Sequence, residues 1–278
     1  DRRKMKYSIC STTYNVAPKL RKALDSILKY TNPDDFEIVV VDSKSADGTL
    51  EILREYQEKF TNFKVVILKC KRGLGRQLAF QNSVGNYIIQ VDLDTVYYAS
   101  WKKLLDLYMH SEFAGTRALQ VPYFGIYPRH LLAGTGGWRN LQLAEDFDLW
   151  QRLIKIDAFK WCPLVVGENW KIKEPEKRQT KSICEVIWRK FIAEKDRFIA
   201  RSEYSLRDRL KECREWSTPK TYYFFWIPVV IFAKVISFPS NKERREAKRV
   251  KDKWQRNMID FESINGERIY NFVPFPRR

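Results

Sequence analysis

Two aspartates one residue apart, Asp92 and Asp94, follow an apolar run within the stretch GNYIIQVDLDTVY at residues 85–97. The β-branched and aromatic residues of this run predict a buried strand. Because carboxylates are costly inside a sheet, we expect both aspartates at the end of the strand. Two hard oxygen ligands there suit Mg²⁺ or Mn²⁺, and such a metal would hold the phosphates of a substrate. The alternative is a solvated turn with two unrelated acids, since an Asp-x-Asp pattern alone has low specificity.

A second group of acids, Glu145, Asp146 and Asp148, lies near the start of a helix predicted over residues 141–154. The dipole of a helix favours negative charge in its first turn. A purely structural role for these acids therefore stands beside a catalytic one.

Strands and helices alternate ahead of the first acidic pair. Strands are predicted at residues 6–14, 36–42, 63–68 and 87–91, and amphipathic helices at residues 17–30, 49–60 and 73–84. The alternation predicts an α/β fold with a doubly wound, mostly parallel sheet and right-handed crossovers. The continuous apolar run FEIVVVD at 36–42 is typical of a central strand that is buried on both faces.

Four polar loops follow the carboxyl ends of these strands, at residues 12–15, 42–47, 71–76 and 92–94. Ligands of open α/β sheets bind outside the carboxyl ends of the strands. We therefore expect the four loops to meet at one crevice, which argues against a chance pair of acids. The loop KRGLGR lacks the GK[ST] of a Walker A motif, so nucleoside triphosphatase chemistry is not expected. Its glycines, Gly73 and Gly75, either serve a phosphate site or are simple turn residues.

The composition limits the classes of function. The 278 residues carry a formal net charge of +17, which attracts nucleic acid, anionic lipid headgroups, or nucleotide and diphosphate substrates. Five cysteines without a CxxC pair argue against a disulfide framework or a zinc cage, and we expect buried, reduced thiols in a cytoplasmic protein. With only two histidines, a histidine metal site or a Ser-His-Asp triad is not expected.

The last third of the chain has a different character. Residues 182–214 predict a long charged helical stretch, and residues 222–238 are the most apolar segment of the chain. That segment has 17 residues and contains Pro228 and Lys234, whereas a spanning helix needs about 20 mostly apolar residues. With basic runs on both sides, it favours peripheral or monotopic attachment to an anionic membrane surface at the cytoplasmic face. A core helix of a second region is the alternative.

Five short motifs occur in order along the chain: STTYN at 11–15, VVVDSKSADGT at 39–49, KRGLGRQLA at 71–79, VDLD at 91–94 and EDFDLWQRL at 145–153. Together they resemble the family 2 glycosyltransferases, which have the GT-A fold. The resemblance implies a nucleotide-sugar-binding and catalytic domain at residues 1–170. Residues 171–278 would form a basic, mainly helical extension that associates with membranes.

The resemblance also implies an activity: inverting, metal-dependent transfer of one sugar from a UDP- or GDP-sugar to an acceptor. Its donor-binding residues would be Thr12, Tyr14, Asn15, Asp42, Arg76 and Asp92. Of these, Asp42 matches the acid that contacts the nucleotide base, and Asp92 matches the acid that contacts the ribose or sugar. The predicted membrane location suggests a lipid-linked acceptor, such as a polyprenyl phosphate or a lipid-linked glycan.

The remaining matched residues carry the chemistry. Asp94 matches the ligand of Mn²⁺ or Mg²⁺, which would stabilise the charge growing on the diphosphate leaving group. Asp146 matches the general base that takes the proton of the attacking hydroxyl during inversion. Glu145 would orient this base or bind acceptor hydroxyls.

The sequence departs from the family pattern at three places. Thr12 replaces the usual proline, and Ser43 and Lys44 replace the usual acid and glycine after Asp42, so the contact with the base and the identity of the donor are open. The QxxRW signature of processive synthases is absent because Leu153 follows the arginine, which favours transfer of a single sugar.

Two other functions remain compatible with the sequence. The first is a basic nucleic-acid-binding protein with a Rossmann-like core, which the charge and the interleaved aromatic residues permit. No nucleic-acid-binding motif is recognisable, and the converging acids would repel phosphates unless a metal intervened, so we expect no nucleic-acid partner. The second is an inactive glycosyltransferase-like scaffold, against which the full set of acids argues.

Overall fold

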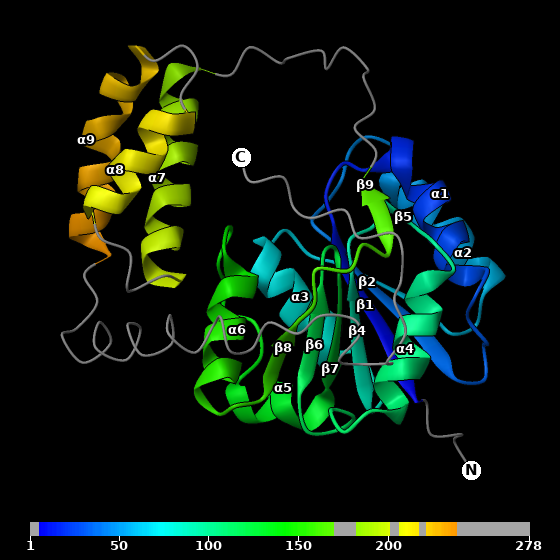
Figure 1. Cartoon of the computed structure of the whole chain (residues 1–278). Helices are drawn as coiled ribbons and strands as arrows, with labels where there is room; N and C mark the ends of the chain where they lie inside the picture. Colours follow the sequence, from blue (N-terminus) through cyan, green and yellow to red (C-terminus); the bar gives the residue numbers. More distant parts are fainter. Residues whose placement is uncertain (1–5, 170–181, 201–205, 217–220, 238–278) are drawn as a thin grey trace.

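The computed structural model describes residues 6–169, 182–200, 206–216 and 221–237 (Figure 1). Its centre is a seven-stranded sheet in the order β3-β2-β1-β4-β7-β6-β8. In that order the strands are Phe63–Ile67, Phe36–Asp42, Tyr7–Thr13, Tyr87–Val91, Phe124–Pro128, Ala118–Val121 and Phe159–Trp161. Strands β1 to β4 are parallel and β7 is antiparallel to both of its neighbours. The mostly parallel, doubly wound sheet is thus confirmed.

Helices cover both faces of the sheet (Figure 1). Helices α1 (Ala17–Leu28), α2 (Thr49–Lys59) and α4 (Ser100–His110) pack on one face. Helices α3 (Arg72–Gln81), α5 (Arg129–Thr135) and α6 (Glu145–Lys155) pack on the other.

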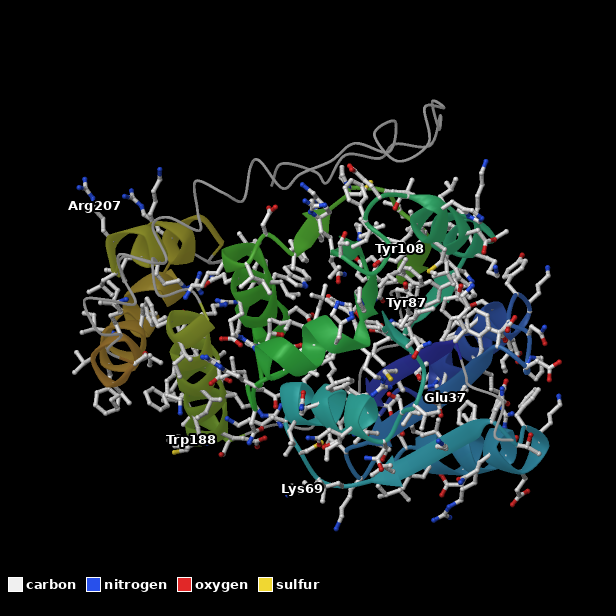
Figure 2. The ribbon with its side chains drawn as sticks, turned by 90° about the horizontal axis from the view of Figure 1, so that it is seen from below. Glu37, Lys69, Tyr87, Tyr108, Trp188 and Arg207 are labelled. Carbon is white, nitrogen blue, oxygen red and sulfur yellow. The ribbon has the colours of Figure 1, made fainter. Side chains whose placement is uncertain are left out.

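Strand β2 explains why the central strands are apolar throughout. Ile38 and Val40 belong to the core under α1, whereas Val39 and Val41 belong to the core under α3, because successive side chains of a strand point to opposite faces. On the face that α4 covers, the rings of Tyr87 and Tyr108 meet edge to face at 6.1 Å between their centroids (Figure 2).

Strands β6 and β7 form a hairpin, in which Tyr123 takes a positive φ of 63°. The start of one helix differs from the sequence expectations. The helix expected over 141–154 begins only at Glu145, because Ala144 has a left-handed backbone with φ of 60°. Residues 141–144 are therefore a loop, and Glu145 and Asp146 are the first two residues of α6.

A short two-stranded sheet lies beside the main one. Strand β5 (Thr95–Tyr97) pairs antiparallel with β9 (Gly167–Asn169), so that Thr95 faces Asn169. This pairing brings the end of the first described range, at Asn169, back to the loop that carries Asp94.

The C-terminal helices form a small bundle beside α6 (Figure 1). Within the stretch at 182–214, predicted as one helical unit, the structure describes α7 (Ile183–Ala200) and α8 (Leu206–Trp216), and the apolar segment forms α9 (Thr221–Ile236). Phe198 of α7 packs with Val230 and Ala233 of α9 in the centre of the bundle. Among the described helices, none combines the length and the apolarity needed to cross a bilayer.

Two expectations fall outside the described residues: the domain boundary at 170/171 and the basic run that follows the apolar segment, at residues 241–256. The expectation of buried thiols holds for Cys10 and Cys162, whereas Cys184 on α7 is exposed.

Candidate active site

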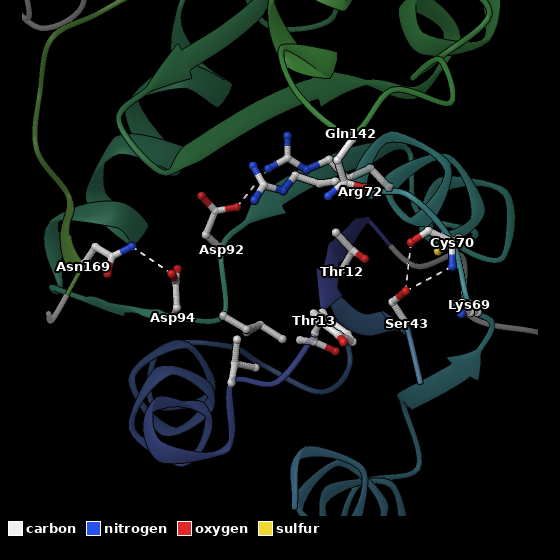
Figure 3. Close-up of a pocket in the computed structure, with 14 residues that line it drawn as sticks. Thr12, Thr13, Ser43, Lys69, Cys70, Arg72, Asp92, Asp94, Gln142 and Asn169 are labelled. Atoms are coloured by element: carbon white, nitrogen blue, oxygen red, sulfur yellow. Dashed lines mark hydrogen bonds and ion pairs between the residues drawn. The ribbon is translucent and has the colours of Figure 1, made fainter. Parts of the chain in front are cut away.

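A cavity of about 570 Å³ opens at the carboxyl ends of β1, β2 and β4 (Figure 3). Its walls come from the four predicted polar loops and from two later segments of the chain. The lining residues are Thr12, Thr13, Tyr14, Val16, Ser43, Lys69, Cys70, Arg72, Arg76, Asp92, Leu93, Asp94, Gln142 and Asn169. The expected convergence of the loops is therefore present, because parallel strands end at the same edge of a sheet.

Asp94 lies in the cavity wall with a neutral partner. The side-chain amide of Asn169 donates to Asp94 Oδ2 at 2.9 Å (Figure 3). Lys19 Nζ in turn donates to Asn169 Oδ1 at 3.1 Å. No ion pair joins Asp94 to a cation within the described part of the chain, so the carboxylate keeps its charge for a ligand. Asn169 is a site residue that the sequence did not indicate, because no motif marks the short β9 strand.

The carboxylate of Asp94 fits a divalent cation that a substrate helps to hold. Within the described residues, no group of three or more His, Cys, Asp or Glu side chains could hold a metal ion. Mg²⁺ is commonly bound by one or two carboxylates together with substrate phosphates and water. One protein carboxylate on an open wall is what that arrangement requires.

Arg76 links the two acidic groups of the sequence. Its guanidinium, only 5% exposed, lies 3.0 Å from Asp92 Oδ1, 3.0 Å from Glu145 Oε1 and in contact with Asp146 Oδ2. Trp138 Nε1 also donates to Asp146 Oδ1 at 3.0 Å. The end of β4 and the start of α6 are thus joined through one buried cation, and both oxygens of Asp146 have defined partners.

Three carboxylates around one arginine leave an excess of negative charge. Burial, followed by the charge of Asp146, raises the pKa of Glu145 to about 7. Burial also raises the pKa of Asp92, although the charge of Arg76 opposes this. Burial disfavours the charged form of Arg76, but the carboxylates of Asp146, Asp92 and Glu145 outweigh it and raise its pKa. The arginine therefore stays charged, and Glu145 holds its proton to a higher pH than an ordinary glutamate does.

The first loop divides its predicted residues between two tasks. Thr12 and Tyr14 line the cavity, and Tyr14 is largely exposed there. Asn15 does not line it: its Oδ1 accepts from Ala46 N at 3.0 Å, and its own N–H donates to Ser45 Oγ at 2.8 Å. Asn15 instead ties the loop after β1 to the loop after β2.

Asp42 lies at the predicted edge of the sheet but faces away from the cavity. It is fully buried, and its Oδ2 accepts from Thr13 Oγ1 at 2.9 Å and from Ser45 Oγ at 2.6 Å. Its Oδ1 accepts from Ser45 N at 2.7 Å. The cavity is lined instead by Ser43, which follows Asp42, and by Cys70, which follows β3. The main-chain N–H of Cys70 donates to Ser43 Oγ at 3.1 Å (Figure 3). Direct contact between Asp42 and a base stays a prediction that this arrangement does not favour.

The glycines of the KRGLGR loop are neither turn residues nor part of an extended phosphate loop. Both lie in α3, where they permit close packing. A Cβ added at Gly75 would lie 2.3 Å from Thr12 Oγ1, and one added at Gly73 would lie 2.0 Å from the carbonyl oxygen of Arg139. The loop that leads into α6 therefore rests directly on the first turn of α3. Arg72 and Gln142 reach the cavity through this packing, which sequence spacing could not indicate.

Comparison with known proteins supplies a family. The model of "Glycosyl transferase family 2" matches residues 8–161. A 94-residue segment is 37% identical to the poly(ribitol-phosphate) beta-glucosyltransferase of Bacillus spizizenii, covering 32% of this chain and 15% of that protein. A 98-residue segment is 30% identical to the putative teichuronic acid biosynthesis glycosyltransferase TuaG of Bacillus subtilis, covering 34% of this chain and 37% of that protein. In both cases the match spans well under half of the relative's length.

Solved structures share the fold at low sequence identity. Residues 1–349 of Staphylococcus aureus TarS match with a TM-score of 0.54 and 16% identity, covering 94% of this chain and 83% of that one. The mannosyltransferase PcManGT of Pyrobaculum calidifontis, in complex with GDP-Man and Mn²⁺, matches with a TM-score of 0.53 and 16% identity, covering 91% and 86%. These similarities support the arrangement of strands and helices. Any statement about the chemistry has to rest on the residues of the cavity.

Proposed function

Because the chain belongs to glycosyl transferase family 2, we propose that it moves a single sugar, with inversion, from a nucleotide diphosphate sugar to an acceptor hydroxyl. One observation carries the proposal. The cavity holds an uncompensated carboxylate, Asp94, on one wall, while Arg76 ties Asp92 to the Glu145–Asp146 pair. The two acidic groups serve the two ends of the reaction, the departure of the diphosphate and the attack of the hydroxyl.

The leaving-group side rests on Asp94 and the cations near it. Asp94 would hold Mn²⁺ or Mg²⁺, and the metal supplies charge stabilisation for the departing diphosphate. Arg72, half exposed in the cavity wall, adds a guanidinium suited to phosphate oxygens. UDP- and GDP-sugars are the donors proposed, since the structural relatives include complexes with UDP-GlcNAc and with GDP-Man.

The attacking side rests on Asp146. Its oxygens are oriented by Arg76 and by the indole N–H of Trp138, and a carboxylate can accept about four hydrogen bonds, so lone pairs remain for an acceptor hydroxyl. Asp146 would take the proton of that hydroxyl as the new bond forms. Glu145, almost fully buried beside Arg76, would help to orient this base.

The acceptor proposed is membrane-associated, as on a lipid-linked glycan. The support is the outer surface of the C-terminal bundle, where Trp188 of α7 projects into solvent (Figure 2) and Phe232 and Val235 of α9 are more than half exposed. Exposed aromatic and aliphatic groups on a chain of net charge +17 suit an anionic lipid surface. The names of the first two relatives supply a competing acceptor, a poly(ribitol phosphate).

The acceptor proposal is tested by sedimentation of the full chain with vesicles. Anionic vesicles should carry the protein down, zwitterionic vesicles should not, and the W188S/F232S double variant should lose most of the binding. Equal sedimentation of the double variant and the wild type would contradict attachment through this surface. Binding to poly(ribitol phosphate) without binding to vesicles would favour that polymer as the acceptor.

The donor reaction is tested with a panel of nucleotide sugars and Mn²⁺, scored for released nucleotide diphosphate. Asp94→Ala should abolish metal-dependent turnover, and Asp146→Asn should abolish transfer while calorimetry still detects binding of the donor nucleotide. Turnover by Asp94→Ala at the wild-type rate would overturn the metal assignment. Binding of random oligonucleotides with no nucleotide binding would favour the nucleic-acid alternative, and nucleotide binding without turnover of any donor would favour an inactive scaffold.

A further inference from the structure

The loop at residues 139–144 carries one wall of the cavity and ends where the acidic pair begins. Gln142 lines the cavity, and Glu145 and Asp146 follow as the first residues of α6. Ala144 reaches α6 through a left-handed backbone conformation. The position of the acidic pair therefore depends on how firmly this loop is held.

One side of the loop is held by α3. The main-chain N–H of Gly73 donates to the carbonyl oxygen of Leu141 at 2.9 Å, and the missing side chain of Gly73 lets Arg139 lie against the helix. This contact belongs to the catalytic region itself.

The other side is held by a residue of the C-terminal bundle. Asp196 of α7, only 1% exposed, accepts a hydrogen bond from the main-chain N–H of Gln142 at 2.7 Å. Its second oxygen, Oδ1, is buried and has no hydrogen-bond partner in the described part of the chain. Burying a carboxylate with one amide donor costs free energy, so the stability of the bundle alone does not explain an aspartate here.

The bundle has its own anchor, which is distinct from Asp196. Glu194, two residues earlier on α7, is fully buried, and its carboxylate pairs with Arg209 of α8 at 2.5 and 2.6 Å. Phe198 packs against α9 in the bundle core. Glu194 thus serves the packing of the three helices, whereas Asp196 reaches the cavity loop.

From these contacts we infer that Asp196 is a positioning residue for the transfer reaction. It fixes the main chain at Gln142 from the side opposite α3, so that the loop delivers Asp146 to the acceptor side of the cavity in one orientation. The helical bundle is then coupled to the reacting centre through one hydrogen bond. The inference rests on the proposed function, because only there does Asp146 act as the base.

The test compares three single variants of the full chain. Asp196→Leu removes the acceptor, Asp196→Asn keeps a carbonyl acceptor for Gln142, and Glu185→Gln removes an exposed carboxylate of the same helix as a matched control. The direct readout is hydrogen exchange in peptides that cover residues 139–144. The kinetic readouts are kcat for transfer and KM for the donor, and thermal unfolding monitors the fold.

We expect Asp196→Leu to speed exchange at Gln142 about tenfold or more, since it removes a hydrogen bond to a charged group. Its kcat should fall by about 10- to 100-fold, because displacing a catalytic group by about 1 Å can cost a factor of that order. KM for the donor should change by less than about twofold, since the ligands of the diphosphate lie elsewhere. Asp196→Asn should restore both exchange and kcat, and Glu185→Gln should match the wild type throughout.

Unchanged exchange in a folded Asp196→Leu variant would overturn the inference, and so would equal loss of kcat in the Leu and Asn variants. If Asp196→Leu does not fold, the Asn variant still decides, because a loss of kcat there with normal exchange contradicts positioning by this hydrogen bond. Failure of the wild type to transfer any sugar would refute the proposed function instead. In that case the exchange results would still report whether Asp196 holds the loop.

Discussion

Gly73→Ala is the substitution that most directly tests whether the packing of the cavity loop governs activity. The added Cβ would lie 2.0 Å from the carbonyl oxygen of Arg139 and 3.1 Å from the Cβ of Glu145. Carbon and oxygen atoms that are not bonded stay more than 3 Å apart, so the loop must move by at least about 1 Å. The two nearest atoms, Arg139 O and Leu141 N, belong to the main chain and cannot rotate away, so the movement is transmitted to the start of α6.

The size of the effect follows from that displacement. Overpacking a tight contact costs about 1–3 kcal/mol of unfolding free energy. A shift of about 1 Å in a catalytic group can lower turnover by about 100-fold. We therefore expect Gly73→Ala to lose much more activity than its modest loss of stability would explain, while donor binding changes little.

Two other glycines serve as matched controls. Gly134 on α5 has no atom within 4 Å of an added Cβ, so Gly134→Ala should leave turnover unchanged and keep or raise stability, by up to about 1 kcal/mol. Gly85 lies at the opposite end of the sheet, where an added Cβ would be 2.5 Å from Ser8 Oγ and 2.6 Å from the carbonyl carbon of Tyr7. Gly85→Ala should therefore lower stability without a selective loss of kcat.

The assay measures urea unfolding, kcat and nucleotide binding for the three variants under one set of conditions. Equal kcat for Gly73→Ala and Gly134→Ala would refute the argument that the loop contact positions the acids. The same refutation would follow if Gly85→Ala lost as much kcat as Gly73→Ala at equal stability, because the loss would then reflect general loosening of the fold.

Three further predictions concern buried charges. Arg76→Met should lower the unfolding free energy measured in urea by about 3–5 kcal/mol, because it leaves three carboxylates without their common cation; a loss below 1 kcal/mol would contradict the bridging role. The raised pKa of Glu145 means that the folded state binds its proton more tightly than the unfolded state, so this group's contribution to stability falls as pH rises from about 4.5 to about 7. Glu145→Gln should remove that part of the pH dependence of the melting temperature, and an unchanged slope would contradict it. Arg209→Met should destabilise the bundle by about 1.5–3 kcal/mol, since the buried Glu194 loses its pair with Arg209 and keeps those with Lys190 and Arg197, and calorimetry should find nucleotide binding unchanged.

Most of the catalytic fold could be predicted from local sequence patterns. Apolar runs of five to seven residues with intervening amphipathic helices are strong signals. Strand β2 and helix α2 begin and end within one residue of their predicted bounds. The late start of α6 could not be predicted, because residues 141–144 have the apolar spacing of a helix and only the backbone of Ala144 interrupts it.

The candidate site shows a similar division. Asp92, Asp94, Glu145, Asp146 and Arg76 were predicted from motif order, and the structure places three of these acids around the guanidinium of Arg76 and Asp94 on the wall of the cavity that Arg76 lines. Motif order did not reveal that Asp42 is buried and accepts three hydrogen bonds within the protein, or that Asn169 and Asp196 approach from later segments. Side-chain orientation and long-range pairing depend on packing, and no periodicity of the sequence indicates either of them.

By itself, the amino-acid sequence determined the alternation of strands and helices, the basic charge of the chain and the acids that could bind a metal and take a proton. Each of these properties is local, because it depends on the order of residue types over a few turns or strands. Only the tertiary structure decided which groups meet: Arg76 among three carboxylates, Asn169 on Asp94, and Asp196 on the cavity loop. In the last two cases the residues in contact are 75 and 54 positions apart in the sequence. The packing that joins them is a property of the whole fold.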